Sequence, residues 1–391
     1  MKDFRDWRRR KKTPRWAPPR RGNPRLRRLA PAAWLAAPLL AALLLPLAVI
    51  PLQRGQTPPP PAGPEATAQP AAAAPQPKIS VYLSRSGQIE SLPLDDYVTG
   101  VLAAEMPADF ELEALKAQAV AARTFIMRRL LTGDASGVPV PGADVTDTVS
   151  HQAYVSKAAL EQAWERGGKS AALAKLRRAV LETRGVVMTY KGQPITASFF
   201  ASSGGFTENS EDYWSASVPY LRSVASPWEK EIAPYYTVTT TFSTAELLSK
   251  LGITTASSSS SKESVPALRE SAMSDSAIAD KTRNLSATSG SAPFMKVLSR
   301  TSGHHIKEIS IGGVVFTGRE VREKLQLRSS QFTWTIRGSR IMITTYGNGH
   351  GVGMSQWGAN GMAKEGKTAT QILKYYYSGI SFTQVSTLLK K

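Results

Sequence analysis

Glu105 is the side chain in this sequence that is best placed to donate a proton. It ends a segment with helical spacing that begins near Asp96, and Pro107 prevents that helix from continuing. The carboxyl end of a helix carries the negative pole of its dipole, and apolar neighbours such as Leu102 and Met106 also disfavour a charged form. Both effects should raise the pKa of Glu105, and a carboxylic acid still protonated near neutral pH can act as a general acid. The alternative is an ordinary exposed glutamate at a helix end.

A second set of candidate residues lies near the C-terminus, where glycines alternate around His350 between positions 347 and 353. Ser355, Gln356 and Trp357 follow and lead into a predicted helix. Backbone amides, a hydroxyl and an amide side chain suit the hydroxyl groups of a sugar, and an aromatic face suits its ring. This segment therefore predicts a polar, sugar-binding site, with a tightly packed turn as the alternative.

The third candidate is Ser202-Ser203-Gly204-Gly205, which directly follows an apolar strand. Paired glycines allow backbone amides to approach a ligand closely, and a plain tight turn is the alternative. The segment lacks the spacing of a phosphate-binding loop. Arg123 lies on a helix predicted for 111–131 and should lie near the groove that we expect between two lobes of the fold. It either pairs with a carboxylate there or holds the corner structurally; the structural role is favoured, and Arg123 is kept among the candidate substrate-binding residues.

The sequence gives little support for a metal or a cofactor. It contains no cysteine, so neither a disulfide nor a thiolate site can form. His304 and His305 are adjacent rather than at helical spacing, and His151 stands alone in its segment, where a structural role is the commoner one. We expect no cofactor.

The predicted elements form a mixed α+β fold of helices packed on twisted, mostly antiparallel strands. The expected helices are 96–105, with Asp95 and Asp96 as capping residues, 111–131, one long charged helix over 156–183 and a helical turn at 318–324. The expected strands are 78–84, a short strand after Gly87, 186–190, 294–300, 306–311 and 332–345. We expect a groove between two lobes, with Glu105 on one lobe and the C-terminal glycines facing it.

The formal charge of +19 over 391 residues is concentrated at the N-terminus. Residues 1–28 form a basic arm, and residues 29–53 carry no charge and are long enough to span a bilayer. A cleaved signal peptide is the rival interpretation. We predict an uncleaved single-pass anchor with its N-terminus in the cytoplasm and the folded domain, 78–391, on the opposite side of the membrane. Residues 54–77 read as a Pro/Ala linker and 254–292 as a flexible Ser-rich insert. A charged arm beside a span usually sets topology, so we expect no nucleic-acid partner.

Four separated motifs resemble the stage II sporulation protein D family, also called the SpoIID/LytB domain family. They are LPLDDYVTGVLAAEMP at 92–107, ALKAQAVAARTF at 114–125, SSGG at 202–205 and GHGVGMSQWGANGMAKEG at 349–366. The resemblance covers nearly all of residues 79–391 apart from the Ser-rich insert.

This resemblance implies a membrane-anchored lytic transglycosylase that cleaves peptidoglycan glycan strands stripped of their stem peptides. It implies that Glu105 is the catalytic acid and that the 202–205 and 349–356 segments line the groove. It also implies forespore engulfment as the setting, with stage II sporulation proteins P and M as partners. Some relatives carry zinc on Cys and His ligands, but here the corresponding loop offers only His151 and no Cys.

Two other functions stay open at this point. A non-catalytic protein that binds the cell wall and enhances an amidase would need the sugar site but not the acid. A two-carboxylate glycosidase would need a second acid flanking the bond, and the sequence shows no obvious partner for Glu105.

Overall fold

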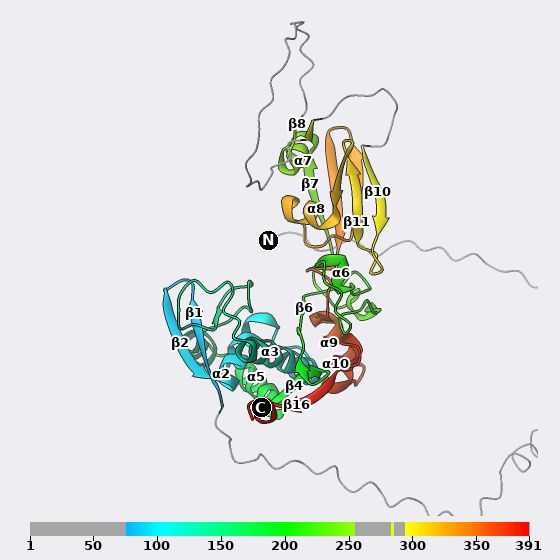
Figure 1. Ribbon diagram of the computed structural model, residues 1–391. Helices are drawn as coiled ribbons and strands as arrows, with labels where there is room; N and C mark the ends of the chain where they lie inside the picture. Colours follow the sequence, from blue (N-terminus) through cyan, green and yellow to red (C-terminus); the bar gives the residue numbers. More distant parts are fainter. Residues whose placement is uncertain (1–75, 255–282, 285–293, 391) are drawn as a thin grey trace, which may run out of the picture. The chain divides into compact units, whose positions relative to one another are not determined.

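The computed structural model describes residues 76–254, 283–284 and 294–390, all of which belong to one compact unit (Figure 1). The basic arm, the predicted membrane span at 29–53, nearly all of the linker and most of the Ser-rich insert lie outside these residues and stay predictions. Within the described ranges, no helix is both long enough and apolar enough to cross a bilayer. The mixed α+β class is confirmed.

One hydrophobic core is built around a single long helix, α3. This helix packs against α2, α5, α9, α10 and the strand β4, and Figure 1 shows it enclosed by them. The elements around this core are β1 Lys78–Leu83, β2 Gln88–Pro93, α2 Leu94–Glu105, α3 Leu112–Thr132, β3 Val145–Thr146, α4 Lys157–Leu160, a π-helical turn η1 Glu161–Glu165, α5 Ser170–Glu182, β4 Val186–Tyr190, β5 Gln193–Pro194, β6 Phe199–Phe200, α6 Ser210–Tyr213, a 3-10 turn η2 Pro227–Glu229, β15 Met354–Ser355, α9 Gln356–Lys364, α10 Ala369–Tyr376, β16 Ser381–Gln384 and α11 Val385–Leu388.

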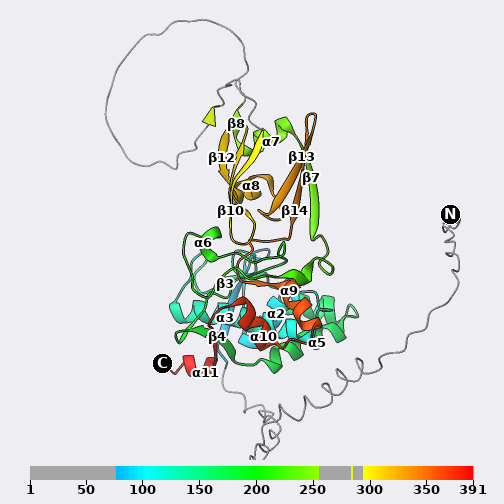
Figure 2. The same cartoon turned by 90° about the vertical axis from the view of Figure 1, so that its right-hand side faces the viewer.

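A second hydrophobic core lies between two three-stranded sheets, which Figure 2 shows together with α8. The sheet orders are β10-β11-β12 and β13-β14-β7, and all their pairings are antiparallel. The elements are β7 Thr237–Ser243, α7 Thr244–Leu251, β8 Ile253–Thr254, β9 Arg283–Asn284, β10 Met295–Arg300, β11 Ile306–Ile311, β12 Val314–Thr317, α8 Gly318–Leu325, β13 Phe332–Arg337 and β14 Arg340–Tyr346.

The two helices that flank the Glu105 corner end where the sequence predicts. α2 stops at Glu105, and Met106 has an extended backbone (φ −129°) because Pro107 follows it. α3 stops at Gly133, whose left-handed backbone (φ 62°) closes the last turn. The start of α2 differs from the prediction. Pro93 occupies the N-cap position, so Asp95 lies inside the first turn, where its charge still faces the positive pole of the helix.

Three predicted elements are wrong in extent. The strand expected over 332–345 is a hairpin, because the chain turns at Gly338 between β13 and β14. The single helix expected over 156–183 is broken, because α4 passes into a π-helical turn and α5 begins only at Ser170, after Gly167 and Gly168. Gly168 has φ 77°, a conformation that a helix cannot contain. The apolar strand expected before residue 202 is reduced to the two residues of β6.

Arg123 ties three elements together inside the first core. Its side chain is 0% exposed, and its guanidinium donates hydrogen bonds to the backbone oxygens of Thr183 (2.8 Å), Val186 (3.2 Å) and Val180 (3.2 Å). An Asp95 oxygen lies 3.6 Å away. Arg123 therefore binds carbonyl oxygens at the C-terminal end of α5 and at the start of β4. Burial lowers the pKa of Arg123 to about 10, and Asp95 offsets part of that shift.

We expect Arg123→Lys to destabilise the fold by roughly 2–4 kcal/mol, because one ammonium cannot reach all three buried carbonyls. Urea unfolding measures this. Arg128→Lys, on the exposed side of the same helix, is the matched control and should change the stability by less than about 0.5 kcal/mol. If Arg123→Lys unfolds like the wild type but binds glycan more weakly, Arg123 is a substrate-binding residue instead.

Candidate functional site

Glu105 is half-buried, and segments distant in sequence meet at its carboxyl group. The backbone N–H of Ala153 donates to Oε1 at 3.0 Å, and the Gln356 side-chain amide donates to Oε2 at 3.3 Å. Both partners are neutral donors, and neither is a carboxylate. Gln356, predicted as a site residue, therefore does lie at Glu105, whereas the contact with Ala153 was not predicted.

The pKa of Glu105 is raised above its usual value, as the sequence predicts. Burial is the largest cause, and the hydrogen bonds from Ala153 and Gln356 lower the pKa by part of that amount. Burial favours the protonated acid, while the two donors stabilise the carboxylate that remains after a proton is given up. The side chain can therefore exist in both states that a proton donor needs.

Three side chains of α9 attach it to the corner that contains Glu105. Besides Gln356, the Trp357 ring packs edge-on against Phe110 with centroids 4.5 Å apart, and the Asn360 side chain accepts a hydrogen bond from the Glu111 backbone at 2.8 Å. Asn360 and Gln356 are four residues apart and so lie on the same face of the helix. α9 thus lies against the turn between α2 and α3.

The start of α9 is fixed by its own sequence and by β6. The Ser355 hydroxyl caps the helix by accepting from the Gly358 backbone at 3.2 Å. Met354 and Ser355 pair in parallel with β6, and the Trp357 backbone donates to the Ala201 oxygen at 3.0 Å. The segment that carries Gln356 consequently runs beside the segment that enters the 202–205 turn.

The 202–205 turn is packed mainly against protein. Ser202 exchanges two backbone hydrogen bonds with Asn348, and both serines are buried. A Cβ on Gly204 would fall 1.9 Å from the side-chain oxygen of Gln331, and one on Gly347 would fall 2.6 Å from the Ser203 carbonyl carbon. The backbone contacts explain the glycine at 347 without any ligand, whereas a side chain at 204 would require only that Gln331 move.

His350 belongs to a cluster of aromatic rings. Its ring centroid lies 5.2 Å from Trp214, 5.5 Å from Tyr213 and 5.6 Å from Phe200. Its Nδ1 accepts a hydrogen bond from the Val352 backbone at 3.0 Å. Burial lowers the pKa of His350 to about 4, so the ring is neutral at physiological pH and serves as an aromatic surface rather than as a proton donor.

Arg123 lies away from this group of residues. It contacts Asp95 in the first turn of α2, whereas Glu105 ends that helix, which places the two acids roughly 15 Å apart along the axis. With its side chain fully buried, Arg123 has no exposed atom for a substrate. We therefore leave it out of the residues proposed to contact glycan.

Sequence reasoning missed two buried acids near the predicted segments. Glu229 is 0% exposed and accepts hydrogen bonds from Ser203. Glu208 is 2% exposed, accepts from Thr301 at 2.7 Å, and lies 3.7 Å from the buried Nε2 of His305. Burial raises the pKa of each acid to about 7. Glu208 occupies a loop and Glu229 a single 3-10 turn, and neither is long enough for a periodic pattern to mark a residue as buried.

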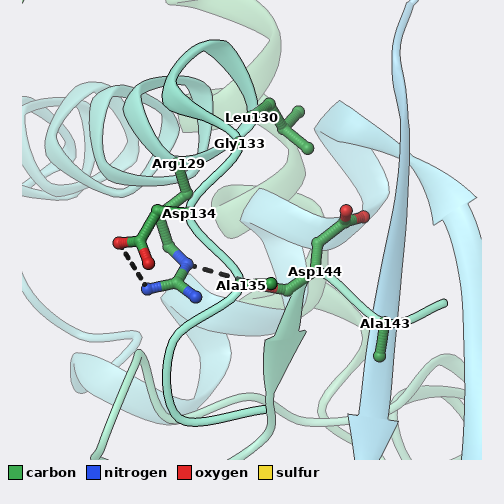
Figure 3. A pocket seen from close by; sticks show the side chains of 7 residues that line it. All are labelled: Arg129, Leu130, Gly133, Asp134, Ala135, Ala143 and Asp144. Carbon is green, nitrogen blue, oxygen red and sulfur yellow. Dashed lines mark hydrogen bonds and ion pairs between the residues drawn. The ribbon is translucent and has the colours of Figure 1, made fainter. Parts of the chain in front are cut away.

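A small cavity of about 140 Å³ lies elsewhere, at the end of α3 (Figure 3). Its lining includes Arg129, whose guanidinium binds Asp134 and the Asp144 backbone oxygen, and does not include Glu105. The predicted groove at Glu105 stays a prediction. Nearby, both ring nitrogens of His151 have protein partners, Thr146 and the Ser136 backbone oxygen. Over the described ranges, no group of three or more His, Cys, Asp or Glu side chains could hold a metal ion.

Comparisons with known proteins agree on one family. A family model described as "Stage II sporulation protein" matches residues 82–190. Stage II sporulation protein D of Bacillus subtilis is 43% identical over 313 residues, which cover 80% of this chain and 81% of the relative. The protein of the same name from Bacillus amyloliquefaciens is 42% identical over 314 residues, or 80% of each chain. A Bacillus subtilis protein named "Amidase enhancer" is 32% identical over 310 residues, but these cover only 40% of that relative.

We expect Glu208→Gln to gain stability relative to the wild type as the pH rises. The folded state holds the Glu208 proton up to about pH 7, whereas an ordinary glutamate releases it near 4.5, so ionisation costs stability between those values. Glutamine avoids this cost, and the relative gain should reach roughly 3 kcal/mol above pH 7. Thermal unfolding from pH 4 to 8 measures it. The stability curve of the exposed Glu308→Gln variant against pH is the control and should run parallel to that of the wild type. A Glu208→Gln stability curve parallel to that of the wild type would refute the shifted pKa of Glu208.

Proposed function

The chain belongs to the stage II sporulation protein D family, and from that premise we propose that it is a peptidoglycan lytic transglycosylase acting on glycan strands that lack stem peptides. One observation carries the proposal. A carboxyl group with a raised pKa ends α2, and its two hydrogen-bond donors are neutral amides, one of them from the segment that follows the C-terminal glycines. A single acid of this kind is what a lytic cleavage requires.

In the proposed reaction the Glu105 proton passes to the glycosidic oxygen, the bond from that oxygen to the muramic acid C1 breaks, and an oxocarbenium-like centre develops. The Glu105 carboxylate then takes the proton of the C6 hydroxyl of the same sugar. The C6 oxygen bonds to C1 and closes a 1,6-anhydro ring. Atoms and charge balance with no water consumed, and Glu105 returns to its protonated state.

The neighbours of Glu105 have defined parts in this scheme. The Ala153 N–H and the Gln356 amide stabilise the carboxylate between the two proton transfers, and they need not move because the fold holds them already. Trp214 and His350 offer aromatic faces for sugar rings further along the strand. The hydroxyls of Ser202 and Ser203 are buried, so we assign them to the support of this segment rather than to direct contact.

The cellular setting is a further part of the proposal. Residues 29–53 would anchor the chain in the cell membrane with the folded domain on the cell-wall side, and the family name points to sporulation. Stage II sporulation proteins P and M would be its partners in forespore engulfment.

A second candidate function follows from the relative named "Amidase enhancer". A chain of this type could bind glycan and stimulate an amidase without cleaving the strand. The two functions differ in their products, because only a lytic transglycosylase leaves 1,6-anhydro ends.

We expect Glu105→Gln to lower the rate of cleavage of denuded glycan by roughly 10²- to 10⁴-fold, because glutamine keeps the size but has no proton to donate. Mass spectrometry of the products gives both the rate and the type of end. Asp109→Asn, an exposed acid in the same corner, should keep the full rate. An equally active Glu105→Gln enzyme would remove Glu105 as the acid, reducing ends would indicate a hydrolase, and glycan binding without products would favour the enhancer.

We expect Trp214→Ala to raise KM for long glycan strands by up to about tenfold while kcat changes little, because ring stacking contributes to binding away from the bond that breaks. Steady-state kinetics on strands of graded length measures this. Tyr235→Ala, which removes an exposed ring outside the His350 cluster, is the control. A fall in kcat with an unchanged KM would show that Trp214 does not form a binding surface for sugar.

A further inference from the structure

Glu229 is a buried acid that the proposed reaction does not use. It ends the 3-10 turn η2, its side chain is 0% exposed, and no basic side chain of the described residues forms an ion pair with it. A carboxyl group in such a position is costly unless several donors satisfy it. The groups that donate hydrogen bonds to Glu229 therefore indicate which segments Glu229 holds in place.

The carboxyl group of Glu229 contacts the 202–205 turn through both of its oxygens. Oε2 accepts a hydrogen bond from the Ser203 backbone N–H, and Oε1 accepts from the Ser203 hydroxyl at 3.0 Å. The same hydroxyl accepts from the Gly205 backbone N–H at 3.1 Å. The carboxyl group of Glu229 thus holds the Ser203 side of the turn, while Asn348 holds Ser202.

The other contacts of Glu229 lead to α9 and α10. Oε1 accepts from the Ser226 hydroxyl at 2.5 Å, and that hydroxyl lies 2.7 Å from the hydroxyl of Tyr376. The Ser355 hydroxyl, which caps α9, donates to the Ala201 oxygen at 3.5 Å and lies near enough to the Glu229 carboxyl to lower its pKa. A Cβ on Gly358 would fall 2.7 Å from Oε1, so the first turn of α9 lies directly on this carboxyl group.

The N-terminus of α9 also carries the side chain that contacts Glu105, the proposed acid. Gln356 is the first residue of α9, immediately after Ser355, and its amide donates to Glu105. η2 supports the same helix further along, because a Cβ on Gly361 would fall 2.2 Å from the Cβ of Trp228. A displacement at Glu229 would therefore move the start of α9 and the Gln356 amide with it.

We propose that Glu229 is a positioning residue: its buried carboxyl ties the 202–205 turn to the N-terminus of α9 and so holds the Gln356 amide on Glu105. The inference rests on the proposed function for its kinetic consequences, but its structural part does not. Glu229 touches no reacting atom. It acts through Gln356, whose hydrogen bond lowers the pKa of Glu105 and stabilises its carboxylate.

The pH profile of cleavage by the full-length protein tests this step. Glu105 must be protonated to act, so the rate falls as the pH rises past its pKa. In Glu229→Gln, which cannot accept the same set of hydrogen bonds, Gln356 is no longer held, kcat falls, and the alkaline limb moves up by about one pH unit. A merely unstable variant would lose active molecules without moving that limb.

Four further variants sharpen the test. Gln356→Ala removes the amide directly and should move the limb by the same amount, and the double variant should show no further shift, because both changes break one connection. Ser226→Ala removes a single hydrogen-bond donor from the Glu229 carboxyl group and should give a smaller shift of the alkaline limb in the same direction. This variant replaces Glu229→Gln in the test if Glu229→Gln does not fold. The exposed Glu231→Gln should leave rate and profile unchanged.

Hydrogen exchange followed by mass spectrometry separates this inference from the proposed function, because it needs no activity. Glu229→Gln should speed exchange in peptides covering 202–206 and 355–362 and leave the strands β10 and β11 unchanged. If the wild type yields no anhydro products while exchange changes as stated, the proposed function fails and the structural tie stands. An unmoved alkaline limb in an active Glu229→Gln enzyme, additive shifts in the double variant, or unchanged exchange would overturn the inference.

Discussion

The site depends on a carboxyl group that is kept out of water at the end of a helix and is met by neutral amides. The Ala153 backbone and the Gln356 side chain supply these amides, and both come from segments that fold over the corner after α2. Without this cover, Glu105 would be an ordinary exposed acid, mostly ionised at neutral pH. The chain must therefore complete its long-range contacts before this side chain acquires its chemistry.

The helix α9 provides most of that cover, and its sequence explains how. Successive positions in it serve different neighbours: Gln356 meets Glu105, Trp357 packs on Phe110, and Asn360 binds the Glu111 backbone. The small residues of the same helix let other segments approach closely. Gly358 leaves room for the Glu229 carboxyl, and a larger residue there would displace it.

Much of the local structure could be predicted from the sequence, because its causes are local. Pro107 fixes the end of α2, and the apolar neighbours of Glu105 predict its raised pKa. The partners of Glu105 could not be predicted, since Gln356 lies 251 residues away in sequence and Ala153 contributes only a backbone group. The glycines at 202–205 suggested a ligand, whereas Gly204 packs against the side chain of Gln331.

The two ends of α2 show why the nature of a partner matters more than its presence. Asp95 in the first turn has an ion pair with Arg184 at 2.8 Å, and Arg123 lies 3.6 Å from it. At the other end of α2, the hydrogen-bond partners of Glu105 are neutral amides, which place no positive charge beside it. Glu229 follows the same rule with hydroxyls and a backbone N–H. A lysine or arginine at position 356 would hold Glu105 equally firmly and would keep it from carrying the proton that the proposed reaction requires.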